Sequence, residues 1–212
     1  MNGRMAELAV EVLVAADVAS ALERGADIVY LIDGIASDLE STFATLSGRT
    51  LRLGLSLDYP EGLNPRYTGL APDDIELRDA LLSRLTAFSG VARKYGLVLE
   101  TVGCHGDLAL DVAEDERCTQ VLARALMHFD SNLSLAIAAG SRGIAVAHHC
   151  GIALQREARV DHAIGPARSC NGATVPRVDR FRMGRLAEGQ DPVSVEKTIG
   201  RTAMPRFTSI EI

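Results

Sequence analysis

The chain has 212 residues, no tryptophan, and 22 lysines and arginines against 28 aspartates and glutamates, for a formal net charge of −6. This length suits one α/β domain with a substantial core. An acidic chain with few aromatic residues lacks the basic face and stacking surface of nucleic-acid-binding proteins, so nucleic acid is not expected as a partner. No run of about 18 apolar residues is present, so no membrane span is expected.

Short apolar runs alternate with helical stretches along the chain. Six strands are predicted at 8–14, 27–32, 51–57, 97–102, 133–138 and 152–158, with one more at 208–212. Helices are predicted between them at 17–25, 37–47, 72–95, 115–129 and 141–149, the last capped by Ser141. Apolar strands alternating with helices indicate parallel pairing with both faces covered. The predicted fold class is α/β: a single-domain parallel (β/α) barrel of six or seven strands over residues 1–212.

The N-terminus and the cysteines indicate the compartment. The stretch MNGRMAELAVEVLV carries Glu7 and Glu11 within its apolar run and has no small-residue cleavage site, so a cytoplasmic protein is expected. The cysteines form no CxxC pair and have no metal-ligand spacing, so we interpret them as reduced packing thiols. They are Cys104, Cys118, Cys150 and Cys170.

Polar side chains follow most of the predicted strands. In a parallel barrel these strand ends converge on one face, where the loops carry the site. We therefore predict a rim that holds carboxylates, histidines and arginines. Its members are Asp33 and Gly34; Asp58, Tyr59, Glu61, Arg66 and Tyr67; Cys104, His105 and Asp107; Gly140 and Ser141; and Glu157, Arg159, Asp161 and His162.

Five segments, in order and with similar gaps, resemble the LamB/YcsF family, whose characterised members are the A subunit of the bacterial ATP-dependent 5-oxoprolinase. GLSLDYPEGLNPRYTGL resembles GAHPGYPDxxGFGRR, and VGCHGDLAL is similar to VKPHGALYN. REARVDHAI resembles EGFADRAY, GATVPR resembles GxLVPR, and ADIVYLIDG is placed like ANIACGFHAG. The resemblance implies a glycoside hydrolase/deacetylase-like barrel, ATP for activating the substrate carbonyl, and two partner subunits.

The chain departs from the family pattern at several positions. The family's histidine after the second strand is replaced by Asp33 or a neighbour, its histidine in GAHP falls at Ser56, and the lysine of KPHG falls at Gly103. Glu11 stands as an acidic remnant of the opening DLNADLGE. Two histidines are thus missing, and because tight zinc sites usually have three protein ligands, no metal is predicted.

The retained residues predict the site. The predicted catalytic residues are His105, Asp58, Glu157 and Asp161, and the predicted substrate-binding residues are Tyr59, Arg66 and Arg177. A histidine suits proton transfer, an arginine suits bidentate contact with a carboxylate, and Glu157 or Asp161 would orient the imidazole or bind a cation. Structural roles stay open for each of them: a loop cap, ion pairs and a buried network.

Two further basic features are assigned structural roles. His148 and His149 fall in the last turn of a predicted helix, where a cation is favourable against the helix dipole, although a metal pair stays open. The basic stretch 176–185 is interpreted as a solvated or interface loop.

Gly140 and Ser141 open a predicted helix, whose N–H groups could bind an anion. Alone, these two residues are a weak indication of an anion site.

Two functions from different classes remain. The first is a 5-oxoprolinase-type hydrolytic subunit that acts on a cyclic amide or related small carboxylic acid, with a rebuilt site and with partner subunits. The second is a non-catalytic relative that keeps the barrel as a small-molecule binding or assembly module. The sequence leaves open whether the chain forms a homo-oligomer.

Overall fold

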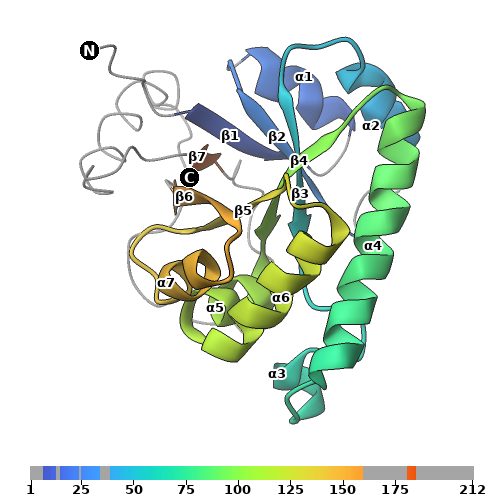
Figure 1. Cartoon of the computed structure of the whole chain (residues 1–212). Helices are drawn as coiled ribbons and strands as arrows, with labels where there is room; N and C mark the ends of the chain where they lie inside the picture. Colours follow the sequence, from blue (N-terminus) through green and yellow to red (C-terminus); the bar gives the residue numbers. More distant parts are fainter. Residues whose placement is uncertain (1–6, 13–14, 24, 34–38, 160–180, 185–212) are drawn as a thin grey trace, which may run out of the picture.

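The computed structural model describes residues 7–12, 15–23, 25–33, 39–159 and 181–184, and the structural statements below refer to these residues. Its strands are β1 (Glu7–Val12), β2 (Ile28–Ile32), β3 (Arg52–Leu57), β4 (Leu99–Cys104), β5 (Ser134–Ala138), β6 (Ala153–Arg159) and β7 (Phe181–Gly184). Its helices are α1 (Ala15–Glu23), α2 (Leu39–Leu46), α3 (Pro65–Thr68), α4 (Asp74–Lys94), α5 (Gly106–Glu114), α6 (Glu116–Phe129) and α7 (Gly143–His149). Figure 1 shows these helices on the outside of the strands, with the long α4 along one side.

Five parallel strand pairs join β1 to β6 in chain order. The α/β class and the parallel sheet predicted from the sequence are confirmed, including the parallel pairing of β3 with β4, where Leu57 lies opposite Cys104. The short β7 pairs antiparallel with both β6 and β1, so the hydrogen-bonded strand order returns to β1. The polar residues at the carboxyl ends of the parallel strands therefore face one end of the molecule.

Three predictions of local structure are wrong. The stretch 176–185 is not wholly a loop, because Phe181–Gly184 forms the strand β7. The edges of β1 and β6 supply backbone hydrogen-bond partners for β7, and the basic composition of the stretch gave no sign of this pairing. The residues that follow His105 lie outside the predicted helices, but α5 begins at Gly106 and buries Leu108 and Val112 at helical spacing. Ser141 does not cap α7: Arg142 holds the N-cap position, and the Ser141 hydroxyl makes no hydrogen bond with the described residues. The strand predicted at 208–212 lies outside the described residues.

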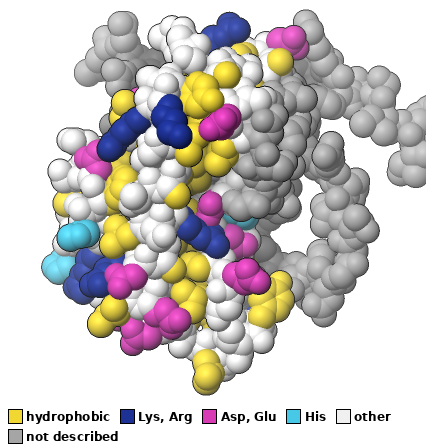
Figure 2. Space-filling view, turned by 90° about the vertical axis from the view of Figure 1, so that its right-hand side faces the viewer, with side chains coloured by type: hydrophobic (Ala, Val, Ile, Leu, Met, Phe, Trp, Pro, Cys, Tyr) yellow, Lys and Arg dark blue, Asp and Glu magenta, His cyan; other side chains and the backbone are white. Residues whose placement is uncertain are grey.

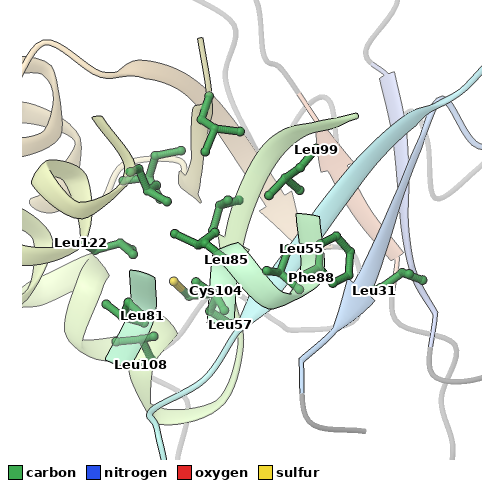
Figure 3. Close-up of a cluster of buried hydrophobic side chains, with 14 of the residues drawn as sticks. Leu31, Leu55, Leu57, Leu81, Leu85, Phe88, Leu99, Cys104, Leu108 and Leu122 are labelled. Carbon is green, nitrogen blue, oxygen red and sulfur yellow. The ribbon is translucent and has the colours of Figure 1, made fainter. Parts of the chain in front are cut away.

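The main hydrophobic core lies between the strands and the helices. Leu81 and Leu85 of α4 are fully buried and recur every four residues, which gives the helix one apolar face. Figure 3 shows these side chains packed against Leu55 and Leu57 of β3. Capping sets the start of α4, since the Asp73 side chain accepts hydrogen bonds from Ile75 N and Glu76 N.

The opposite face of the strands encloses a second, smaller core. Alternate residues of a strand point to opposite faces, so Ile28 and Tyr30 of β2 pack with Ala9 and Ala136, while their neighbours join the main core. Toward the carboxyl ends this inner face becomes polar. The buried polar residues on or directly after the strands are Glu11, Ser56, Thr101, His105, Gln155 and Glu157.

The described surface carries mixed charges. Figure 2 shows acidic and basic side chains close to one another, with apolar side chains between them, on the face formed by α4. None of the described helices combines the length and the apolar character that a membrane span requires.

Removing the Leu85 side chain tests the main core. Leu85 is 0% exposed, so Leu85→Ala leaves a cavity, and we expect a loss of about 2–5 kcal/mol in the free energy of unfolding. Leu70→Ala is the control, because Leu70 is 76% exposed and its removal should change stability by about 0.5 kcal/mol or less. Urea denaturation followed by circular dichroism measures both; equal losses would show that α4 does not bury Leu85.

Candidate functional site

His105 lies where β4 ends and α5 begins. Its backbone is extended (φ −127°, ψ 178°), and it holds the N-cap position of α5 without a side-chain capping hydrogen bond. Its backbone N donates to Leu57 O at 2.9 Å, which continues the β3–β4 pairing one residue further. The histidine is 9% exposed and therefore lies within the polar inner face, beside the end of β3.

Two buried side chains lie on the Nδ1 side of His105. Ser56 Oγ, on β3, lies 3.3 Å from His105 Nδ1. The same hydroxyl donates a hydrogen bond of 2.9 Å to Oε1 of Glu11, on β1. Ser56 is 0% and Glu11 8% exposed, so a buried serine links the imidazole to a buried carboxylate on another strand.

Asp58 lies on the other side of the imidazole. Its Oδ1 accepts hydrogen bonds from Tyr59 N at 2.8 Å and from Leu108 N at 3.3 Å, so it caps the first turn of α5 in place of His105. Its Oδ2 lies 3.9 Å from His105 Nε2. The Asp58 side chain is 36% exposed and that of His105 11%, so the Nε2 side of the imidazole is the side open to solvent.

A glycine makes this close approach geometrically feasible. Gly106 has φ +58°, and a Cβ there would lie 2.3 Å from Asp58 Oδ2. Any side chain at residue 106 would therefore displace the Asp58 carboxylate as well as strain the backbone. The second glycine of VGCHGDLAL, Gly106, is explained by this contact between the residue after β3 and the start of α5.

Glu157 belongs to a second buried network on the inner face. Tyr30 OH lies 2.8 Å from Glu157 Oε1 and 3.4 Å from Gln155 Oε1. A phenol has one proton, so we assign the donation to the nearer, carboxylate oxygen. Thr101 Oγ1 lies 3.2 Å from the phenol oxygen and 3.3 Å from Gln155 Oε1. The Tyr30 ring lies over Gly54, where a Cβ would come within 2.4 Å of it.

Arg66 and Tyr59 belong to a separate cluster on the outer side. The Arg66 guanidinium makes two hydrogen bonds to Asp111, of 2.9 and 3.2 Å, and its Nε lies 3.3 Å from Asp107 Oδ1. Tyr59 OH donates to Asp111 Oδ2 at 2.7 Å. A hollow of about 390 Å3 lies beside this cluster, lined by Tyr59, Arg66 and Cys118 among others, and His105 is not part of its described lining.

The environment of this cluster perturbs its titratable groups. Burial, followed by the hydrogen bond to Asp111, raises the pKa of Tyr59 well above its ordinary value. The hydrogen bond to Asp111 raises the pKa of Arg66. Burial raises the pKa of the Cys118 thiol to about 11. These groups keep their protons at neutral pH and are suited to donating hydrogen bonds rather than to taking up protons.

The remaining predicted site residues are placed as follows. Asp33 pairs with Arg84 of α4, so its carboxylate is turned toward a helix. His148 and His149 lie in the last turn of α7, as predicted, and both are exposed. Asp161, His162 and Arg177 lie outside the described residues.

Sequence reasoning missed part of the inner network: Ser56 and Glu11 were noted only as departures from a pattern, and Tyr30, Thr101 and Gln155 were not identified. A signal was available, because polar or small residues occupy every second position at the carboxyl ends of β3, β4 and β6, most clearly in β3, where leucines lie between them. The alternating positions are Gly54, Ser56 and Asp58; Thr101, Gly103 and His105; and Gln155 and Glu157.

The described residues form no cluster of side chains suited to a metal ion. Among them, no group of three or more histidine, cysteine, aspartate or glutamate side chains is arranged to hold a metal. Two arginines close to the strand ends, Arg66 and Arg84, are already paired with aspartates. The chemistry of the site is therefore derived below from its own side chains.

These features define an α/β protein with a parallel sheet and a buried, histidine-containing polar site at the strand ends. The model of the LamB/YcsF family matches residues 39–180, more than half of the chain, and the chain belongs to this family.

Curated relatives are distant. The chain is 26% identical to the A subunit of 5-oxoprolinase from Pyrococcus furiosus over 158 residues, which cover 74% of this chain and 58% of that protein. It is 34% identical to the A subunit of 5-oxoprolinase from Methylococcus capsulatus over 122 residues, which cover 58% of this chain and 45% of that protein. The chain thus spans about half the length of these relatives.

A solved structure shares the fold. The lactam utilization protein from Thermus thermophilus matches with a TM-score of 0.54 and 21% identity, over 61% of this chain and 54% of that one. At this identity the likeness concerns the fold alone.

Replacing Gly106 tests the contact between Asp58 and α5. Gly106→Ala combines a positive φ with a collision at Asp58, so we expect a loss of about 2 kcal/mol or more in the free energy of unfolding. Gly62→Ala is the matched control: Gly62 also has a positive φ, +78°, but a Cβ there meets nothing within 4 Å, so about 1 kcal/mol is expected. Losses of equal size in thermal unfolding would contradict the close approach of Asp58.

Thiol reactivity tests the environment of Cys118. The thiolate is the reactive form, and Cys118 is both buried (5% exposed) and raised in pKa to about 11. In the native protein at pH 8 we expect iodoacetamide to modify Cys118 more slowly than the half-buried Cys150. Mass spectrometry of the tryptic peptides measures both rates; faster labelling of Cys118 would show that the cluster around Tyr59 is open.

Proposed function

We propose that this chain is a component of a 5-oxoprolinase-type hydrolase and resembles its A subunit, acting on a cyclic amide or a related small carboxylic acid through a site rebuilt around His105. The observation that carries the proposal is the position of His105, between Ser56 and Asp58 at the carboxyl ends of the parallel strands. The family membership and the strand order, which returns to β1, support it, and we propose that the strands form a (β/α) barrel of the glycoside hydrolase/deacetylase-like type. The relatives' designation as A subunits supports the existence of partner subunits.

His105 supplies the proton transfers that ring opening requires. A cyclic amide is stabilised by resonance, and in the proposed complex ATP would supply activation of the carbonyl from a partner subunit. As water attacks the carbonyl carbon, His105 Nε2 takes one of its protons; when the C–N bond breaks, the same proton passes to the leaving nitrogen. Asp58 Oδ2, 3.9 Å from Nε2, stabilises the imidazolium between these steps.

Arg66 and Tyr59 are the proposed contacts for the substrate carboxylate, with Arg177 as a third. Arg66 would have to exchange one of its aspartates for the substrate. Its side chain is 38% exposed, and ion pairs near the surface contribute only about 1 kcal/mol or less, so such an exchange costs little. Glu157 is held by Tyr30 and is proposed, with Asp161, to complete the acidic part of the site.

A second candidate is a non-catalytic module for small-molecule binding or assembly. It is favoured by the engagement of Arg66 with both Asp107 and Asp111, and of Asp33 with Arg84. In this case the fold would be retained for a ligand or partner without turnover.

The deciding experiment adds the purified chain to the partner subunits of a 5-oxoprolinase with 5-oxoproline and ATP, and follows glutamate release. We expect turnover that His105→Ala lowers by a factor of about 10² or more, the range for loss of a general acid or base. His128→Ala is the control, because His128 lies on α6 away from the strand ends and should leave the rate unchanged. Circular dichroism confirms that both variants are folded.

A negative result would contradict the proposed hydrolase function. It requires that the partner subunits release glutamate when a known A subunit is added but release none when this chain is added. Saturable binding of 5-oxoproline under those conditions, weakened by Arg66→Ala, would establish the binding module instead.

A further inference from the structure

The contacts of Ser56 restrict where the proton of His105 resides. A serine hydroxyl has one proton to donate and two lone pairs that accept. Ser56 Oγ donates its proton to Glu11 Oε1 across 2.9 Å. Toward His105 Nδ1, 3.3 Å away, the same oxygen is therefore left as an acceptor.

A hydrogen bond between Ser56 Oγ and His105 then requires a proton on Nδ1. Neutral imidazole has one protonated and one bare nitrogen, and the hydrogen bond made by one of them determines the tautomer. With Nδ1–H directed at Ser56, the bare nitrogen is Nε2, which faces Asp58 and the open side of the site. The chain of contacts runs from the Glu11 carboxylate through the Ser56 hydroxyl to the imidazole.

We propose that Ser56 and Glu11 are positioning residues that hold His105 in the tautomer protonated on Nδ1, so that Nε2 is the nitrogen that accepts the proton. The inference rests on the proposed function for its catalytic meaning, whereas the tautomer itself follows from the contacts. It also gives the serine a role of its own, since Ser56 connects the imidazole to a carboxylate on a non-adjacent strand.

Burial is the reason that these two residues can set the tautomer. Ser56 is 0%, Glu11 8% and His105 9% exposed, so water competes little for their hydrogen bonds. A buried carboxylate is costly unless it is hydrogen-bonded, which makes Glu11 a strong acceptor for the Ser56 proton. When His105 becomes an imidazolium, Nδ1–H stays on Ser56, and the added charge lies between Glu11 and Asp58.

The tautomer is measurable without activity. In uniformly ¹⁵N-labelled protein, long-range ¹H–¹⁵N spectra at a pH where His105 is neutral distinguish a protonated from a bare ring nitrogen, with the His105 signal assigned by its loss in His105→Ala. We expect Nδ1 to be protonated and Nε2 bare in the wild type. In Ser56→Ala, Nδ1 loses its acceptor, so the proton should move to Nε2.

Two further variants make the test specific. Ser89→Ala removes another buried serine hydroxyl, one on α4 with no hydrogen-bond partner among the described residues, and should leave the His105 tautomer unchanged. Glu11→Gln keeps an acceptor oxygen for Ser56 and should retain the tautomer if the protein folds. Should Ser56→Ala fail to fold, Ser56→Cys, which retains a similar volume but is a poor acceptor, replaces it with the same expectation.

The outcomes separate this inference from the proposed function. A wild-type spectrum with the proton on Nε2, or a tautomer unchanged in Ser56→Ala or its Ser56→Cys substitute, overturns the inference whether or not the protein is active. In the reconstituted assay, Ser56→Ala should lower kcat about tenfold or more with little change in KM, because it affects the base and not substrate contact; an unchanged kcat also overturns it. Absence of turnover in the wild type overturns the proposed function and leaves the tautomer to be decided by the spectra.

Discussion

The Asp58 carboxylate joins the end of β3 to the start of α5 through hydrogen bonds from Tyr59 N and Leu108 N, and presents its second oxygen to His105. The first turn of a helix has backbone N–H groups without helical partners. Because His105 makes no capping hydrogen bond, Asp58 supplies that partner from the neighbouring strand. The same side chain therefore connects β3 with α5 and places a carboxylate next to the imidazole, and the absence of a side chain at Gly106 leaves room for it.

The strands separate two environments with different tasks. Their outer face packs leucines against α4, α5 and α6, and supplies apolar burial. Their inner face is apolar at one end, around Ile28 and Tyr30, and polar at the other. Buried polar groups stabilise little on balance, but they are costly to leave without partners. The hydrogen bonds from Ser56 to Glu11 and from Tyr30 to Glu157 meet that requirement and give each side chain a defined orientation.

The two clusters near the strand ends differ in what they can do. Around His105, a buried imidazole lies between two carboxylates, one reached through a serine, which is an arrangement for moving a proton. Around Arg66, guanidinium, phenol and carboxylates satisfy one another, and the raised pKa values of Tyr59 and Cys118 keep these groups protonated. Ser56 takes part in both halves of the inner network, since its hydroxyl donates to Glu11 and lies next to His105 Nδ1.

The sequence by itself determined the α/β class, the parallel order of the first six strands, the placement of His105 at a strand end and the family. These follow from local pattern: apolar runs alternate with helical stretches, glycines end helices, and VGCHGDLAL carries its motif in consecutive residues. Only the tertiary structure decided which side chains meet. Glu11 and Ser56 come from two different strands, and His105 follows a third. Arg66 has Asp111 of α5 as its partner across 45 residues of chain, and no local spacing encodes these contacts. The short strand β7 likewise forms because the edges of β1 and β6 offer backbone partners. Four residues are too few for their own composition to predict a strand, so the pairing depends on these neighbours.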